Sequence, residues 1–367
     1  MIKSAYIHIP FCNHICSYCD FCKMLYKKEW VDSYLDALEE EINTIYQNVE
    51  LETIYIGGGT PSCLDLNQLE RLFQILEKLH KKANIEYTIE GNFDTTTLEK
   101  LLLYKKYGIN RLSFGLESTH PENWKLLDRQ ENLQQVRDII HQAKELGFNN
   151  INIDLMYALP TETIEMVQKD LNFILSLDIE HISTYSLIIE EHTKLHINHY
   201  QNIEEDLDEK MYQKIIKTLK KNHFHHYEIS NFAKPGKYSK HNTCYWNNEE
   251  YYGFGLGASS YRNNKRTTNT RSLSKYIEKK WIKEEETLSR KDKQEYEIIL
   301  NLRKQEGINL KEFKEKYKKH LEDLYDISHL LKENFIQKNE EYLWIPEEKW
   351  YISNEIIVKI LGSEKNG

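Results

Sequence analysis

The 367-residue sequence lacks several features that would each place it in a narrow class. It has no apolar run near the roughly 20 residues of a membrane-spanning helix. Its first residues, MIKSAYIHIPFC, lack the long apolar stretch and cleavage site of a secretion signal, which predicts a cytoplasmic protein. Positive charge is also in short supply. With 49 Lys and Arg against 58 Asp and Glu, the net charge of −9 argues against recruitment of nucleic acid.

Cysteine is scarce as well, and its distribution is uneven. Four of the six cysteines lie between Cys12 and Cys22. In a long chain without a secretion signal, such crowding indicates metal binding rather than disulfides. Cys63 and Cys244 have no neighbouring cysteine in the sequence, and we interpret them as structural residues.

Short apolar segments alternate with amphipathic helical patterns over the first 232 residues, and this alternation predicts an α/β fold. Six segments are too short for helices and rich in Ile, Tyr and Thr. We expect strands at 5–9, 53–56, 86–89, 111–114, 150–155 and 181–187, and helices at 30–46, 66–81, 97–107, 133–146 and 164–177. Asp65 and Gln68 fit a capping box at the second helix. Six such units favour a partial (β/α)6 barrel over a closed barrel of eight.

The regular alternation of predicted strands and helices ends near residue 232, and the sequence divides into three units. Residues 1–232 form the predicted barrel, ending in a further strand at 227–232. Residues 233–285 form a Gly- and aromatic-rich extension with a charged connector at 275–286. Residues 286–367 form a winged-helix-like module, with helices at 295–303, 310–316, 321–333 and 354–361 and a strand pair around 342–344. Because this module has no basic recognition helix, we expect it to pack or dock rather than bind DNA.

The strongest motif is C-x3-C-x2-C, formed by Cys12, Cys16 and Cys19 directly after the first strand. Thiolates are the usual ligands of iron–sulfur clusters. Three close thiolates can hold three irons of a [4Fe–4S] cluster and leave the fourth iron open to a small molecule. A zinc knuckle, or chance spacing, is the alternative interpretation.

Glycines and polar residues follow the later strands, at the end of a barrel where active sites lie. Gly57-Gly58-Gly59-Thr60-Pro61 follows the second strand and could bring backbone N–H groups to a ligand, although a tight turn needs glycine too. The further polar residues at these strand ends are Glu90, Glu117, Arg129 and Asp154. Any one of them could be only a cap or a surface group.

Several segments together resemble the coproporphyrinogen-oxidase-like branch of the radical S-adenosylmethionine (SAM) proteins. They are YIHIPFC, CNHICSYCDF, GGGTPS, TIEGN, RLSFGLES, INIDLMYALP and YSLIIEE, and they occur in that family's order over nearly the whole chain. The resemblance implies that Cys12, Cys16 and Cys19 ligate a [4Fe–4S] cluster whose fourth iron binds SAM.

The same resemblance implies roles for further residues of this chain. Gly58, Gly59 and Thr60 would meet the methionine end of SAM, and Glu90 and Arg129 would bind its charged groups. Asp154 would contact the ribose side. Tyr6 and Tyr18 would flank the cluster and the cofactor.

This sequence departs from the family at two positions. Glu117 stands where the family usually has glutamine, and a carboxylate accepts hydrogen bonds from ribose hydroxyls but cannot donate one. Cys22 stands where the nearest relatives usually carry asparagine. The oxygen-independent oxidases have a fourth cysteine two residues after the third, not three, so we interpret Cys22 as a bystander.

Within this branch the resemblance leaves a choice between a haem chaperone of the HemW type and a coproporphyrinogen III oxidase. Cys12 lies almost at the start of the chain, whereas the oxidases carry a longer N-terminal segment. The segment His241-Asn242-Thr243-Cys244-Tyr245-Trp246 matches the HNxxYW signature of the chaperone group. Imidazole is a common axial ligand of haem iron, so we expect His241 to contact haem, unless it only hydrogen-bonds within its loop.

The resulting prediction is a protein that binds a cluster, SAM and haem, and delivers haem to an acceptor protein. Coproporphyrinogen III decarboxylation is the first alternative. A structural iron–sulfur protein that never cleaves SAM is the second.

Overall fold

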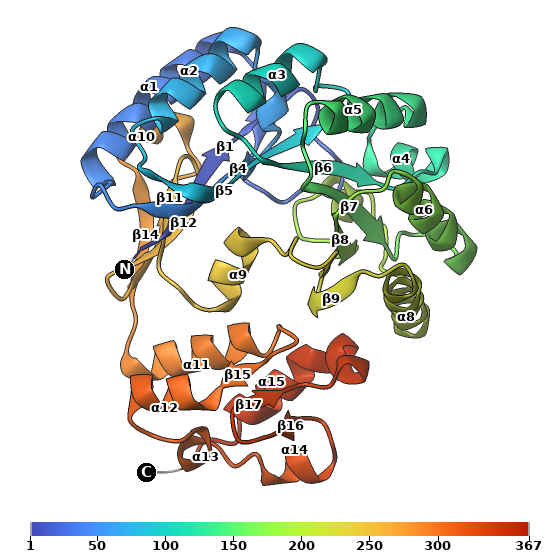
Figure 1. Ribbon diagram of the computed structural model, residues 1–367, viewed down its shortest axis with the longest axis vertical. Helices are drawn as coiled ribbons and strands as arrows, with labels where there is room; N and C mark the ends of the chain where they lie inside the picture. Colours follow the sequence, from blue (N-terminus) through green and yellow to red (C-terminus); the bar gives the residue numbers. More distant parts are fainter. Residues whose placement is uncertain (1, 366–367) are drawn as a thin grey trace.

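The computed structural model describes residues 2–365, and a twelve-stranded sheet dominates it (Figure 1). The strand order is β14-β13-β12-β11-β1-β4-β5-β6-β7-β8-β10-β9. Six consecutive strands run parallel: β1 (Ser4–Ile9), β4 (Leu51–Gly58), β5 (Lys81–Asn92), β6 (Arg111–Glu117), β7 (Ile151–Tyr157) and β8 (His181–Ser186). These are the six strands predicted from the sequence, and they confirm the α/β partial barrel.

Helices cover the outer face of this parallel sheet (Figure 1). They are α1 (Lys28–Ile45), α2 (Leu66–Leu76), α3 (Leu98–Lys106), α5 (Leu133–Glu145), α6 (Ile164–Ser176) and α8 (Glu205–Lys221). The capping box of Asp65 and Gln68 is present at α2. The prediction that this helix runs to residue 81 was wrong, because Lys81 already pairs with Leu51 as the first residue of β5.

The two faces of the parallel strands differ in chemistry. Residues facing the helices are apolar and almost fully buried, such as Ile54, Leu112 and Ile153. Burying a side chain of this size contributes about 1.5–3 kcal/mol. The alternate residues, which point into the barrel, are polar and bond to one another across strands. Asn152 donates to Ser113 Oγ at 2.9 Å, and its carbonyl oxygen lies 2.6 Å from His181 Nδ1. The barrel interior is therefore a polar layer beneath the strand ends.

Residues 225–287 complete the same sheet. The predicted strand at 227–232 is a hairpin of β9 (His225–Glu228) and β10 (Asn231–Ala233), in which β10 pairs antiparallel with β8. After helix α9 (Lys240–Trp246), β11 (Tyr251–Phe254) pairs in parallel with β1. Antiparallel β12 (Ser259–Arg262), β13 (Lys265–Asn269) and β14 (Ile282–Thr287) follow. The predicted charged connector is in fact α10 (Leu273–Ile277) and β14, an edge strand whose residues are all exposed.

The C-terminal module combines short helices with a small antiparallel sheet of three strands, one more than predicted. The helices are α11 (Arg290–Asn301), α12 (Leu310–Tyr317), α13 (Leu321–Leu324), α14 (Ser328–Lys332) and α15 (Ser353–Leu361), and the strands are β15 (Ile308–Asn309), β16 (Gln337–Lys338) and β17 (Tyr342–Trp344). The single helix predicted at 321–333 is broken because Asp326 bonds the backbone N–H and hydroxyl of Ser328.

The module docks on the barrel through backbone hydrogen bonds. Ile229 N–H donates to the Arg303 carbonyl at 3.0 Å, and Gln305 N–H donates to the Tyr227 carbonyl at 3.1 Å. Across residues 2–365, no helix has the length and apolar character needed to cross a membrane.

Candidate functional site

The cysteine loop lies at the carboxyl ends of the parallel strands. It leaves β2 (Phe11–Cys12) and returns to β3 (Met24–Leu25), and these two strands pair with each other. Cys12, Cys16 and Cys19 all line one cavity of about 490 Å³. Thr60 Oγ1 donates to Cys12 Sγ at 3.6 Å. The three thiols therefore lie together at one cavity.

The surroundings of the three thiols favour their protonated form. Burial raises the pKa of the Cys12 thiol to about 11 and also raises the pKa values of Cys16 and Cys19. Metal binding must therefore displace their protons. Over residues 2–365 no three Cys, His, Asp or Glu side chains are arranged to share a single ion. A cubane cluster does not require this, because each thiolate binds a different iron, so the three thiols fit a [4Fe–4S] cluster.

The glycine turn after β4 packs directly against the cysteine loop. A Cβ atom on Gly59 would lie 2.8 Å from the Phe11 carbonyl oxygen and 2.9 Å from Cys12 Sγ. Gly58 has a φ of +117°, and a Cβ atom there would lie 2.5 Å from the His8 ring. Both positions therefore require glycine for packing, and Gly58 requires it for its backbone conformation as well. Gly58 N–H donates to Glu90 Oε2 at 2.9 Å, which ties the turn to the end of β5.

Three predicted carboxylates, Glu90, Glu117 and Asp154, and Arg129 line the same cavity as the cysteines. Burial raises the pKa of Glu90 to about 7 and raises the pKa values of Glu117 and Asp154, while the Arg129 charge acts against the increase at Glu117. Arg129 Nη1 lies 3.9 Å from Glu117 Oε1. The site thus gathers buried acidic groups around one guanidinium, an arrangement suited to a zwitterionic ligand.

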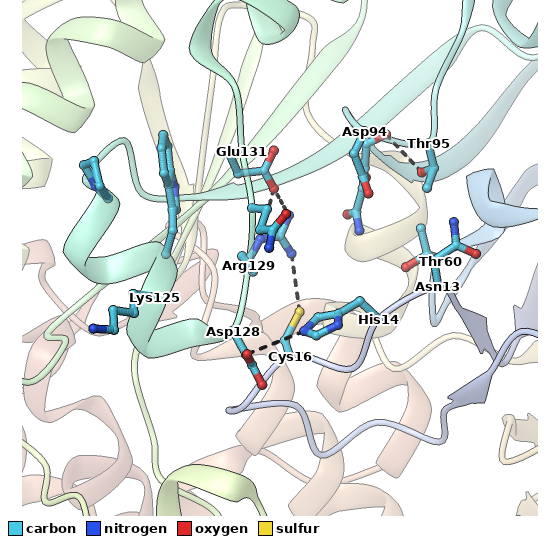
Figure 2. Close-up of a pocket in the computed structure, with 14 residues that line it drawn as sticks. Asn13, His14, Cys16, Thr60, Asp94, Thr95, Lys125, Asp128, Arg129 and Glu131 are labelled. Carbon is cyan, nitrogen blue, oxygen red and sulfur yellow. Dashed lines mark hydrogen bonds and ion pairs between the residues drawn. The ribbon is translucent and has the colours of Figure 1, made fainter.

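Arg129 is fixed by several contacts beside the cysteine loop. Its guanidinium donates to Glu131 at 2.6 Å, to the Gly115 carbonyl at 2.9 Å and to Cys16 Sγ at 3.6 Å. Figure 2 shows Arg129 between Glu131 and Cys16. Tyr18, which also lines the cavity, donates to Glu117 Oε1 at 2.9 Å. The guanidinium and its acidic neighbours are therefore oriented before any ligand binds.

A second cavity, of about 600 Å³, adjoins the first and shares Cys16, Thr60 and Arg129 with it. Trp124 and Lys125 line its wall, and His14 lies between the two cavities. The His14 side chain is 59% exposed, and its Nε2 lies 3.8 Å from Asp128 Oδ1 (Figure 2). The sequence did not single out His14, although it lies between two cluster cysteines.

Two predicted site residues are outside both cavities of the described chain. Tyr6 lines neither cavity. Its hydroxyl is 2.9 Å from Nδ1 of His8, the residue whose ring packs against Gly58 of the glycine turn. His241 is 1% exposed and belongs to α9, not to a loop. Its Nδ1 lies 2.8 Å from Thr53 Oγ1 and its Nε2 lies 2.8 Å from Tyr245 Oη. In this conformation neither ring nitrogen is free for iron, so the haem contact of His241 stays a prediction.

Arg111 and Tyr55 act on the carboxylates of the candidate site, and the sequence reasoning did not single them out. Arg111 is 1% exposed in the polar layer, and its charge favours the ionised forms of Glu90 and Asp154. Tyr55 donates to Glu90 Oε1 at 2.7 Å. The signal was available: polar residues alternate with apolar ones in Arg111-Leu112-Ser113 and Asn152-Ile153-Asp154, as expected for a strand with one polar face.

Comparison with known proteins identifies two matching regions in the chain. Residues 6–174 match the radical SAM superfamily, and residues 288–352 match the HemN C-terminal domain. The chain is 38% identical to the haem chaperone HemW of Bacillus subtilis, over 98% of this chain and 100% of that protein. It is 39% identical to the haem chaperone HemW of Lactococcus lactis, over 99% of this chain and 98% of that protein.

The solved structure of coproporphyrinogen III oxidase HemN from Escherichia coli has a similar fold. It superposes with a TM-score of 0.87 over 98% of this chain and 90% of that chain, at 21% sequence identity. This likeness confirms the arrangement of barrel and C-terminal module.

Proposed function

Because the chain belongs to the HemW family of radical SAM proteins, we propose that it is a haem chaperone that binds haem and delivers it to an acceptor protein. The full-length similarity to two haem chaperones supports this function. The observation that carries the cofactor part is the meeting of three cysteines, three carboxylates and Arg129 in one cavity. The acceptor would be a protein that lacks its haem.

The proposed cofactors are a [4Fe–4S] cluster on Cys12, Cys16 and Cys19, and SAM. The bound pair would supply reductive cleavage of SAM to methionine and a 5′-deoxyadenosyl radical. In this chain, Glu90 and Arg129 would hold the ammonium and carboxylate of SAM, with Gly58, Gly59 and Thr60 beside its methionine end. Glu117 and Asp154 would face the ribose. The acidic cavity and its fixed guanidinium support these assignments.

The ionisation of Glu90 predicts that SAM binds more tightly as pH rises. Burial sets the pKa of Glu90 near 7; the Tyr55 and Gly58 hydrogen bonds and the Arg111 charge lower it, and the Asp154 charge raises it. Below that pKa the protonated carboxyl cannot pair with the SAM ammonium. We expect affinity to increase roughly five- to tenfold from pH 6 to pH 7.5, below the range where the ligand's own amino group loses its proton.

Equilibrium dialysis of the reconstituted protein at several pH values measures this effect. The matched control is Glu90→Gln, which should bind SAM weakly with little change over the same range. If SAM affinity changes with pH equally in wild type and Glu90→Gln, a group other than Glu90 causes the pH dependence.

The haem would bind where an imidazole can reach iron without breaking the fold. Of the described residues that line the two cavities, His14 is the one histidine. Its ring is largely exposed and Trp124 offers an aromatic surface nearby. His241 would have to leave Thr53 or Tyr245 to bind haem. We therefore propose His14 as the axial ligand at the cavity mouth.

Haem titration distinguishes the two histidines. We expect His14→Ala to bind haem roughly tenfold or more weakly, a loss of about 1.4 kcal/mol or more, and to shift the Soret band. His241→Ala should keep the band and affinity but lower stability by about 1–3 kcal/mol, because Thr53 and Tyr245 lose a buried partner. The exposed His196 supplies a control, as His196→Ala should match wild type. A changed Soret band only in His241→Ala would restore that residue as the ligand.

An anaerobic assay with each tetrapyrrole tests the proposed function itself. With reductant and SAM, the reconstituted wild type should bind haem, transfer it to a haem-free acceptor and leave coproporphyrinogen III unconverted. Conversion of coproporphyrinogen III would establish the oxidase alternative. The formation of 5′-deoxyadenosine separates a radical enzyme from a protein whose cluster is only structural.

A further inference from the structure

The short helix α9 closes the barrel at the end opposite the cysteine loop. Figure 1 shows it between the sheet and the C-terminal module. The backbone N–H groups of Lys240 and His241 donate to the Glu86 carboxylate, each at 3.0 Å. Glu86 lies in β5 directly beside Thr53 of β4. The helix is therefore anchored to the two strands that lead up to the glycine turn and to Glu90.

The His241 ring is enclosed between these strands and its own helix. Thr53 contacts Nδ1 and Tyr245 contacts Nε2, so the ring is fixed at both nitrogens. Its face stacks on Tyr55, with the ring centroids 5.1 Å apart and the planes inclined by 26°. The Tyr245 ring meets His241 edge-on at 4.9 Å. Within the HNxxYW motif, the first residue, His241, thus packs against Tyr55, and the fifth, Tyr245, holds His241 in place.

Tyr55 connects the fixed His241 ring to Glu90 of the candidate site. Its hydroxyl donates to Glu90 Oε1 at 2.7 Å, while Gly58 N–H holds Oε2 at 2.9 Å. A Cβ atom on Gly57 would lie 2.7 Å from Glu90 Oε2, so the carboxylate already fills the space beside the turn. The direction of the Glu90 carboxylate therefore depends on where the Tyr55 ring lies.

We propose that His241 and Tyr245 of the HNxxYW motif are positioning residues for SAM binding, acting on Glu90 through Tyr55. This inference rests on the SAM site of the proposed function, and gives the motif a role at the cofactor rather than at haem. It requires no movement of His241. It also accounts for the burial of His241, which lies outside both cavities.

The test measures SAM affinity and the EPR spectrum of the reduced cluster with SAM, using the full-length reconstituted protein. Tyr55→Phe removes only the hydroxyl that reaches Glu90, and Tyr245→Phe removes only the hydroxyl that holds His241. We expect SAM binding to weaken roughly three- to tenfold in Tyr55→Phe and less in Tyr245→Phe, as for indirect loss of a hydrogen bond to a charged group. The SAM-induced change in the EPR spectrum should decrease in the same order.

Two further variants separate positioning from general destabilisation. Thr243→Ala removes the hydroxyl that bonds the Ser239 carbonyl within α9 but contacts neither Tyr55 nor Glu90, so SAM affinity should be unchanged. Glu90→Gln should weaken SAM binding at least as much as Tyr55→Phe.

Wild-type SAM affinity and EPR spectra in both tyrosine variants would overturn the inference if Glu90→Gln is impaired. An unimpaired Glu90→Gln would overturn it together with the assignment of Glu90 to SAM. Haem transfer by the wild type is measured separately, so neither result is confused with failure of the chaperone function.

Discussion

Replacing Cys16 with alanine should abolish the iron–sulfur cluster. Cys12, Cys16 and Cys19 would each ligate one iron, and no fourth thiol of the described chain lines the cavity to replace Cys16. After anaerobic reconstitution we expect the content of iron and labile sulfide to fall to background. The visible absorption of the iron–sulfur cluster should be lost as well. SAM binding should fall with them, because the open iron supplies part of its site.

Cys22→Asn is the matched control in the same loop. The His8 Nε2 atom lies 2.7 Å from the Cys22 carbonyl oxygen, a contact that any residue at this position can keep. The Cys22 side chain packs against Gly257, where an added Cβ atom would lie 2.9 Å from its sulfur. It lines neither cavity, so the cluster should be unaffected. A Cys22 variant without iron would show that the fourth cysteine is a ligand after all.

The parts of the molecule that the sequence predicted well are those with strong local patterns. The six barrel strands and their helices have clear periodicity, and parallel strands place their carboxyl ends at one edge. Glu90, Glu117 and Asp154 could therefore be assigned to one mouth before their contacts were known. The glycine turn was ambiguous from sequence. The structure shows that Gly58 and Gly59 are also required by the packing of His8 and Cys12.

The parts that were missed depend on contacts between distant segments. His241 and Thr53 are 188 residues apart in the chain, so no local pattern could show that the HNxxYW motif closes the barrel. Strand β14 has only exposed residues, so it carries no apolar alternation and was predicted as a connector. The second cavity joins residues of the cysteine loop to residues after β6, and its existence depends on how those loops pack.

Replacing Arg129 with alanine should weaken SAM binding roughly ten- to a hundredfold. The loss of a charge-assisted contact to the SAM carboxylate costs on the order of 1.5–3 kcal/mol, and each 1.4 kcal/mol is tenfold in affinity. The change also leaves Glu131 buried beside no cation, so folding must be checked by thermal unfolding. Arg129→Lys keeps the charge without the planar fork and should lie between wild type and Arg129→Ala. Isothermal titration of SAM into each reconstituted variant gives the order.

Glu117→Gln tests the other side of the same guanidinium. Glu117 Oε1 lies 3.9 Å from Arg129 Nη1 and accepts from Tyr18, so its charge competes with the SAM carboxylate for Arg129. An amide removes that competition and adds a donor for the ribose. SAM affinity should therefore hold or increase in Glu117→Gln, while Arg129→Ala loses it. If Arg129→Ala binds SAM as tightly as wild type in a folded, cluster-containing protein, Arg129 serves only to hold Glu131 and Gly115, and the carboxylate of SAM has another partner.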